Sequence, residues 1–101
     1  MIGNSSSGLL EAPSFKIATI NIGDRQKGRI KADSVIDCLP DKASIKNSFK
    51  VLYSKKFQSV LKNSKNPYGN GYASQKIVKV LKTVPLDNIL KKFFFNVKFS
   101  L

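Results

Sequence analysis

Small polar residues near the start of the chain form a pattern that could hold a phosphate group. Gly3-Asn4-Ser5-Ser6-Ser7-Gly8 stands between Ile2 and the apolar pair Leu9-Leu10. The pattern predicts a flexible loop followed by a short helix over residues 9–12. Serine hydroxyls and the N–H groups at a helix N-terminus can donate to an anion, and glycines let the backbone approach it closely. An ordinary helix start capped by serine explains the same residues, so this alternative stays open.

Two charged residues could complete such a site. Glu11 is the single glutamate, and it could accept hydrogen bonds from the vicinal hydroxyls of a ribose. Arg25 follows a β-branched run, which places it at the carboxyl end of a predicted strand, where open α/β sheets bind ligands. A guanidinium there pairs well with phosphate. Two alternatives stay open: Glu11 is an acid of the first helical turn that the helix dipole stabilises, and residues 25–31 form a solvated basic loop.

Several catalytic and metal-binding classes are excluded by composition. The chain has no histidine and one cysteine, Cys38, which rules out a Cys/His zinc site, an internal disulfide and a nucleophile paired with histidine. Asp33 and Asp37 are the one pair of neighbouring carboxylates, and we interpret them as surface and strand-end residues. We therefore predict no catalytic residue, no metal and no cofactor within these 101 residues.

The charge balance is strongly basic. Eighteen Lys and Arg face six acids, a net charge of +12, and thirteen of the basic residues follow Asp41. Such a balance suits nucleic acid or an anionic membrane. Sixteen of the eighteen are lysines at helical intervals without a basic block, which favours solvated helix faces. A small nucleic-acid-binding protein remains the alternative from another class. No apolar run approaches the ~20 residues of a membrane-spanning helix, and we expect no signal peptide.

Hydrophobic periodicity predicts strands and helices in alternation. Two strands are expected, over 16–22 and 34–38, followed by a helix that Asp41 caps and whose inner face carries Ile45, Phe49, Leu52 and Tyr53. The further expected elements are a helix ending near 63, a turn-rich loop over 66–71, a helix capped by Ser74 with Ile77, Val78 and Leu81 inward, and an apolar stripe from Leu86 to Val97. This order indicates an α/β fold with a parallel sheet.

Both ends of the chain read as if they pack on a missing part. Two strands are too few for an independent sheet, and only Ile2 remains of the strand that should lead into the serine loop. The last segment carries more aromatics than this core could cover, namely Phe93, Phe94, Phe95 and Phe99. We therefore expect a C-terminal fragment of a larger enzyme.

Three segments together resemble the hydrolysing UDP-N-acetylglucosamine 2-epimerases, bacterial enzymes of sialic-acid precursor synthesis. They are Gly3 to Phe15, Thr19-Ile20-Asn21-Ile22-Gly23-Asp24-Arg25-Gln26-Lys27-Gly28-Arg29, and Asn66-Pro67-Tyr68-Gly69-Asn70-Gly71. The resemblance covers nearly the whole chain and is dense over Gly3 to Asp37. The family's serine loop, glutamate and arginine are all present. The non-hydrolysing relatives carry an Asp-Ser-Gly-Gly loop instead, so the chain looks like the hydrolysing branch.

The resemblance implies a fold, a reaction and a nucleotide site. The fold would be the C-terminal portion of a GT-B-type enzyme of two Rossmann-like domains: residues 1–84 would belong to the nucleotide-binding domain, and 85–101 would form a helix crossing back to the missing N-terminal domain. Elimination of UDP and addition of water would give N-acetylmannosamine and UDP. By similarity, the UDP-binding residues are Ser5, Ser6, Ser7, Gly8, Glu11 and Arg25.

The resemblance also implies limits on this chain. The acid and base groups of the reaction would lie outside it, so the chain alone would be inactive, either as part of a full enzyme or as a non-catalytic nucleotide-sugar-binding remnant. The full enzyme would be a cytoplasmic homodimer that binds neither membrane nor, as we expect, nucleic acid. The choice between UDP and GDP sugars stays open, because the base-reading residues would lie mostly upstream.

Overall fold

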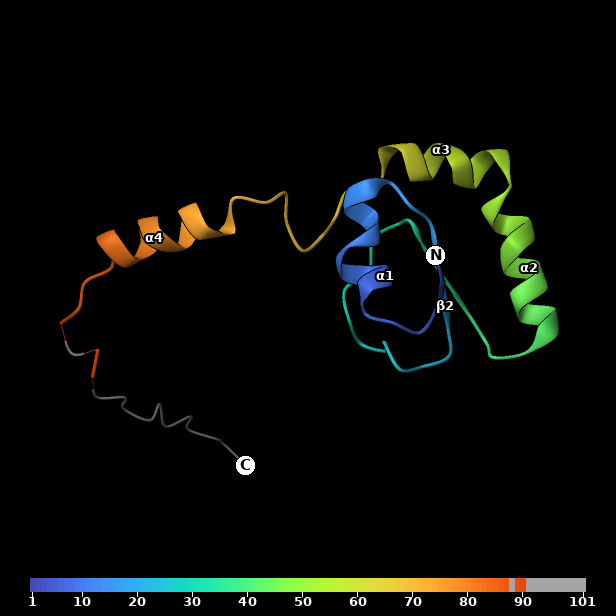
Figure 1. Cartoon of the computed structure of the whole chain (residues 1–101), viewed down its shortest axis with the longest axis horizontal. Helices are drawn as coiled ribbons and strands as arrows, with labels where there is room; N and C mark the ends of the chain where they lie inside the picture. Colours follow the sequence, from blue (N-terminus) through green and yellow to red (C-terminus); the bar gives the residue numbers. More distant parts are fainter. Residues whose placement is uncertain (88, 91–101) are drawn as a thin grey trace, which may run out of the picture. The chain divides into compact units, whose positions relative to one another are not determined.

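The computed structural model describes residues 1–87, 89 and 90, which fall into two compact units. The first unit covers residues 1–70 and contains every strand found in the described residues. The second begins at Gly71 and contains one described helix. Figure 1 traces both units along the sequence, and each is considered by itself below.

A three-stranded parallel sheet organises the first unit. Its strands are β1 (Ile2–Gly3), β2 (Thr19–Ile22) and β3 (Val35–Cys38), in the order β1-β2-β3. Ile20 lies opposite Ile2 on one side and opposite Ile36 on the other. The predicted α/β class with a parallel sheet is confirmed. Ile2, the one residue assigned from the sequence to the strand before the serine loop, belongs to β1 and pairs with β2.

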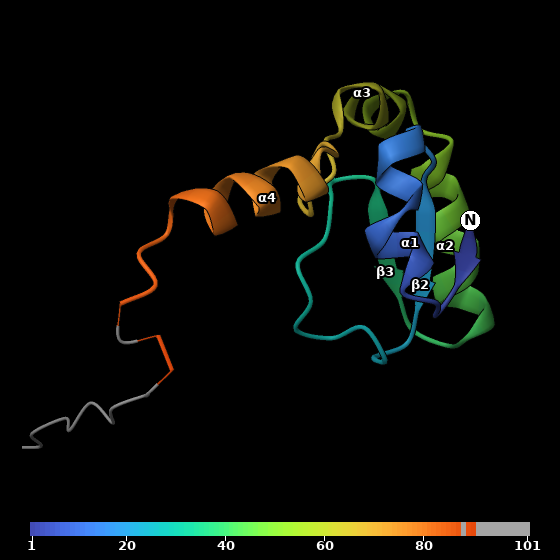
Figure 2. The same cartoon turned by 60° about the vertical axis from the view of Figure 1, so that its left-hand side comes forward.

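Helices cover both faces of this sheet. Figures 1 and 2 show α1 (Ser7–Leu10) and α2 (Lys42–Leu52) on opposite sides of β2. Thr19 faces α1, because its hydroxyl donates to the Gly8 carbonyl at 3.0 Å. Ile20 must point to the other face, since side chains alternate along a strand. The buried apolar side chains in the described residues are few: Leu9, Ala12, Pro13, Ile20, Ala32 and Phe57.

The two helices after the sheet begin at polar caps. Asp41 accepts a hydrogen bond from Ser44 N at 2.8 Å at the start of α2, as the sequence predicts. Ser54 accepts one from Phe57 N at 3.2 Å at the start of α3 (Lys55–Asn63). The predicted apolar face of α2 is only partly covered, because Phe49 and Tyr53 are exposed while Ser48 is buried.

Two predicted boundaries around Pro13 are wrong. The helix expected over 9–12 runs from Ser7 to Leu10, and a 3₁₀ turn, η1 (Ala12–Phe15), follows it with Pro13 in its first turn. The strand expected from Lys16 starts only at Thr19. Lys16 closes η1 in the left-handed region at φ 55°, so extended backbone cannot begin there.

The loop after α3 ties distant segments of the first unit together. The Asn66 side-chain amide donates to the Leu10 carbonyl at 2.8 Å and to Ser14 Oγ at 2.7 Å. The Tyr68 hydroxyl donates to the Ile30 carbonyl at 2.9 Å. This loop therefore anchors both the α1–η1 segment and the basic loop after β2.

The second unit contains α4 (Ala73–Thr83). The expected Ser74 cap is wrong: the helix begins after Tyr72, whose φ of 61° turns the chain, and no side chain caps it. The face expected to point inward, Ile77, Val78 and Leu81, is exposed. Most of the predicted 85–101 helix lies outside the described residues. Within that range, residues 85–87, 89 and 90 are described, and they form loop and turn. No helix in the described part is long and apolar enough to cross a membrane.

The contact between α1 and β2 yields a stability prediction. A Cβ on Gly8 would lie 2.6 Å from Thr19 Cγ2, and buried Thr19 is held by its hydroxyl bond. Gly8→Ala should therefore lower the free energy of unfolding by about 1–3 kcal/mol, measured by urea denaturation. Adding Thr19→Ser removes the clashing methyl and should restore part of the loss. An alanine variant as stable as the parent chain would contradict the close contact.

Candidate functional site

Three loops meet at the carboxyl edge of the sheet. Residues 4–6 follow β1, residues 23–34 follow β2, and Leu39-Pro40 follow β3. Because the strands are parallel, all three loops leave the same edge, which is where open α/β sheets bind their ligands. The structure therefore brings the serine loop and the Arg25 loop to one edge, as the sequence predicts.

The serine loop offers free donors. Its bonds are local: Ser5 Oγ donates to Ser7 Oγ and accepts from Ser7 N, each at 3.3 Å. Ser6 stands at the N-cap of α1 but its hydroxyl makes no cap bond. The N–H groups of Ser5 and Ser6 donate to no described residue. If Ser6 were an ordinary helix cap, its hydroxyl would accept a hydrogen bond from a backbone N–H of α1, and this bond is absent. The dipole of a four-residue helix is small.

Packing of α1 against β2 explains why residue 8 is a glycine. Its N–H donates to the Ser5 carbonyl at 3.2 Å and its own carbonyl accepts from Thr19. Both backbone groups are thus engaged, and the missing side chain lets α1 lie against β2. These contacts account for a glycine here without a ligand, so its contact with a nucleotide stays a prediction.

Glu11 and Arg25 are both exposed and without side-chain partners among the described residues. Glu11 follows α1 and does not stand in its first turn, so the helix-dipole interpretation does not apply to α1. Arg25 lies two residues beyond Gly23, at the end of β2. A free carboxylate and a free guanidinium near open N–H groups form a donor and acceptor set suited to a phosphorylated nucleoside.

Sequence reasoning missed Gln26. Its side chain is only 3% exposed, and its Nε2 donates to the Asn4 carbonyl at 2.8 Å. The other amide atom, Oε1, is buried without a hydrogen-bond partner in the described structure. A glutamine within a run of exposed charged residues gives no signal of burial, because the sequence shows neither the turn nor the carbonyl it meets.

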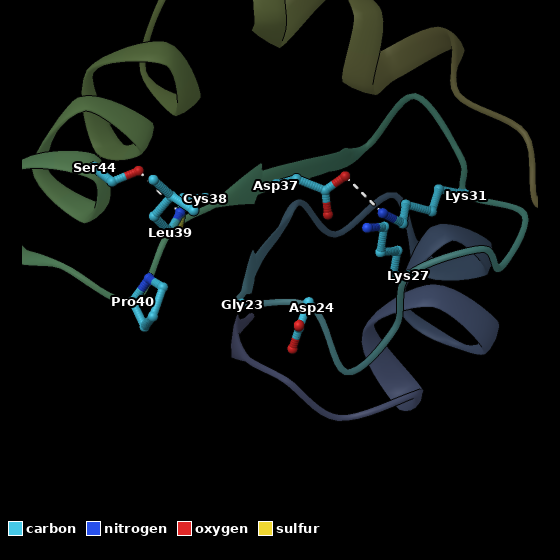
Figure 3. A pocket seen from close by; sticks show the side chains of 9 residues that line it. All are labelled: Gly23, Asp24, Lys27, Lys31, Asp37, Cys38, Leu39, Pro40 and Ser44. Carbon is cyan, nitrogen blue, oxygen red and sulfur yellow. Dashed lines mark hydrogen bonds and ion pairs between the residues drawn. The ribbon is translucent and has the colours of Figure 1, made fainter.

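A pocket of about 560 Å³ opens beside these loops, at the ends of β2 and β3 (Figure 3). Its lining includes Asp24, Lys27, Lys31, Asp37 and Ser44. None of the six predicted nucleotide-binding residues lines it. Among the described residues, no three side chains of His, Cys, Asp or Glu gather as a metal site would require.

Asp37 organises the polar side of this pocket. It accepts hydrogen bonds from Asn21 Nδ2 at 2.7 Å and from Lys31 Nζ at 2.6 Å. Figure 3 shows Lys31 reaching Asp37 while Asp24 points away. Burial raises the pKa of Asp37, but the hydrogen bonds from Lys31 and Asn21 and the lysine charge outweigh it, so the pKa lies below its ordinary value of 3.8. Asp37 is thus a strand-end ion-pair partner, close to its predicted place.

Comparison with known proteins matches nearly all of the described chain. The family model for UDP-N-acetylglucosamine 2-epimerase matches residues 1–82. The polysialic acid biosynthesis protein P7 of Escherichia coli is 50% identical over 81% of this chain and 21% of its own length. The GDP/UDP-N,N'-diacetylbacillosamine 2-epimerase (hydrolyzing) of Campylobacter jejuni is 51% identical over 95% of this chain and 25% of its own length. The UDP-N,N'-diacetylbacillosamine 2-epimerase (hydrolyzing) of Legionella pneumophila is 40% identical over 91% of this chain and 24% of its own length.

The lowered pKa of Asp37 predicts a pH dependence. A carboxylate with a lower pKa in the folded state than in the unfolded state stabilises the fold above about pH 3.8, and this stabilisation is lost as the pH falls through the folded value. Asp37→Asn should therefore make the loss of stability below about pH 4 shallower, measured by urea unfolding across pH. Lys27→Met changes a lysine of the same pocket that does not bond Asp37, and it should keep the parent acid dependence. An unchanged acid dependence in Asp37→Asn would rule out the effect.

Proposed function

The chain belongs to the UDP-N-acetylglucosamine 2-epimerase family, and from this premise we propose that it is the nucleotide-binding part of a hydrolysing 2-epimerase. The complete enzyme would convert UDP-N-acetylglucosamine to N-acetylmannosamine and UDP. UDP would leave C1 of the sugar as C2 loses its proton, giving 2-acetamidoglucal, and water would then add across the double bond. Two relatives are named hydrolyzing 2-epimerases, which supports this type of reaction over simple epimerisation.

One observation carries the proposed nucleotide site: unpaired groups of the required kinds stand at one sheet edge. The free N–H groups of Ser5 and Ser6 and the hydroxyls of Ser6 and Ser7 would donate to the diphosphate, and Arg25 would pair with its charge. Glu11 would accept hydrogen bonds from the ribose hydroxyls. In this proposal, the pocket at the ends of β2 and β3 would receive another part of the ligand.

The chain spans about a fifth to a quarter of the length of the relatives that it matches. We therefore assign the acid and base steps to parts of the enzyme outside these residues. In this proposal residues 1–84 belong to the second domain of a two-domain enzyme and residues 85–101 return to the first domain. The outer edge of β1 and the exposed face of α4 are surfaces that such an assembly would cover, and the full enzyme would form a homodimer in the cytoplasm.

Substitution of Arg25 tests the nucleotide site. Arg25→Met should weaken UDP binding about tenfold or more, because a charge-assisted hydrogen bond contributes about 1.5–3 kcal/mol, and should weaken uridine binding far less. The affinities are measured by titration calorimetry or by NMR titration. Arg29→Met is the matched control, since Arg29 lies on the same loop and is exposed.

The comparison of UDP with uridine separates phosphate contacts from general effects. Equal losses for UDP and uridine in Arg25→Met would remove Arg25 from the phosphates. Equal losses in Arg25→Met and Arg29→Met would mean that only the net charge of the loop matters.

The 101-residue chain by itself should not turn over UDP-N-acetylglucosamine. It contains no histidine, and its described carboxylates form no cluster of three. The assay incubates the purified chain with UDP-N-acetylglucosamine and measures UDP and N-acetylmannosamine. Turnover by a preparation free of longer epimerases would refute the assignment of the acid and base groups to other parts of the enzyme.

A further inference from the structure

We propose that Gln26 is a positioning residue, which fixes the serine loop relative to Arg25 so that both can contact one diphosphate. The identity of the ligand rests on the proposed function. The positional role rests on the contact between Gln26 and Asn4 and can be tested without a ligand.

The contact joins the two loops directly. Gln26 Nε2 donates to the Asn4 carbonyl at 2.8 Å across 22 residues of sequence, and the glutamine side chain is almost fully buried. Asn4 immediately precedes Ser5, and Gln26 immediately follows Arg25. Because adjacent Cα atoms are about 3.8 Å apart, fixing Asn4 and Gln26 also fixes the backbone at Ser5 and Arg25.

No other described hydrogen bond joins residues 4–6 directly to the turn over residues 24–29. Pairing between β1 and β2 stops at Gly3 opposite Asn21, before either loop begins. The bonds within the serine loop connect residues 5 to 11 with one another. The turn over residues 24–29 is likewise held by its own bonds, from Lys27 N to the Asp24 carbonyl and from Arg29 N to the Gln26 carbonyl. Without Gln26, each loop would keep its shape but would lose this direct bond to the other, since Thr19 and Asn66 bind α1 and not the serine loop itself.

Stability alone does not explain a glutamine at this position. Its Oε1 is buried without a partner in the described structure, and burying an unpaired polar atom costs free energy. An apolar side chain of similar length would fill the same space without that cost. The amide at residue 26 is therefore best explained by its donor Nε2, which hydrogen-bonds to the Asn4 carbonyl.

The test replaces Gln26 by methionine, which keeps the length of the side chain and removes the amide. Gln58→Met is the matched control, since Gln58 Nε2 donates to the Leu52 carbonyl at 2.6 Å, away from both loops. Two quantities are measured in each variant: the ¹H–¹⁵N heteronuclear NOE of Ser5, Ser6 and Ser7 without ligand, and the affinity for UDP. Urea denaturation monitors the fold.

In Gln26→Met we expect lower NOE values at the three serines and UDP binding weaker by roughly two- to tenfold, the range for one hydrogen bond. Gln58→Met should change neither. Unchanged NOE values in a folded Gln26→Met chain would overturn the proposal, whatever happens to UDP binding. Lower NOE values with unchanged affinity for UDP would overturn the role in phosphate contact.

Two further outcomes are kept apart. If the parent chain binds no UDP, the proposed nucleotide site fails in this chain, while the NOE values still decide whether Gln26 orders the serine loop. If Gln26→Met does not fold, Gln26→Ala is measured in its place, because a methyl group also lacks a donor to the Asn4 carbonyl and occupies less space. Parent NOE values in that variant would overturn the proposal.

Discussion

Parallel pairing on both sides of β2 is the constraint on which the site depends. β2 is four residues long and lies between β1 and β3, so every loop that carries a candidate ligand group leaves the sheet beside it. The strand is buried from Thr19 to Asn21. Thr19 fixes α1 through the Gly8 carbonyl, and Asn21 fixes Asp37 on the neighbouring strand. A single short strand thus sets the positions of the serine loop, the Arg25 loop and the pocket beside β3.

Polar tethers supplement a small apolar core. Few apolar side chains are buried among the described positions, and such a core gives limited stability to a domain of this size. Side-chain hydrogen bonds from Gln26, Asn66 and Tyr68 cross long stretches of sequence to backbone carbonyls. Each tether ends on a segment next to the candidate site. The loops of the proposed site are therefore positioned more by these hydrogen bonds than by the packing of apolar side chains.

The distribution of charge fits a nucleotide better than the whole-chain value suggests. Most of the net charge of +12 comes from lysines beyond Asp41, nine of which lie on α2, α3 and α4. At the sheet edge itself, Lys31 pairs with Asp37, while Arg25, Lys27 and Arg29 on the loop after β2 have no side-chain partner among the described residues. An edge with free cations and open N–H groups is suited to a ligand with phosphate groups. Under the proposed function, that ligand is a nucleotide sugar.

The sequence by itself determined the fold class, the family and the candidate ligand groups. β-branched runs, turn residues and the Asp41 cap act over a few residues, so their outcomes can be read locally. Tertiary structure decided what depends on distant partners. It placed the start of β2 at Thr19, because Lys16 is needed in the left-handed region at the end of η1, and it buried Gln26 against a carbonyl 22 residues away. It also gave Gly8 its packing contact with Thr19. Such pairings are not local in sequence, since they arise only when the parallel strands bring their loops to one edge.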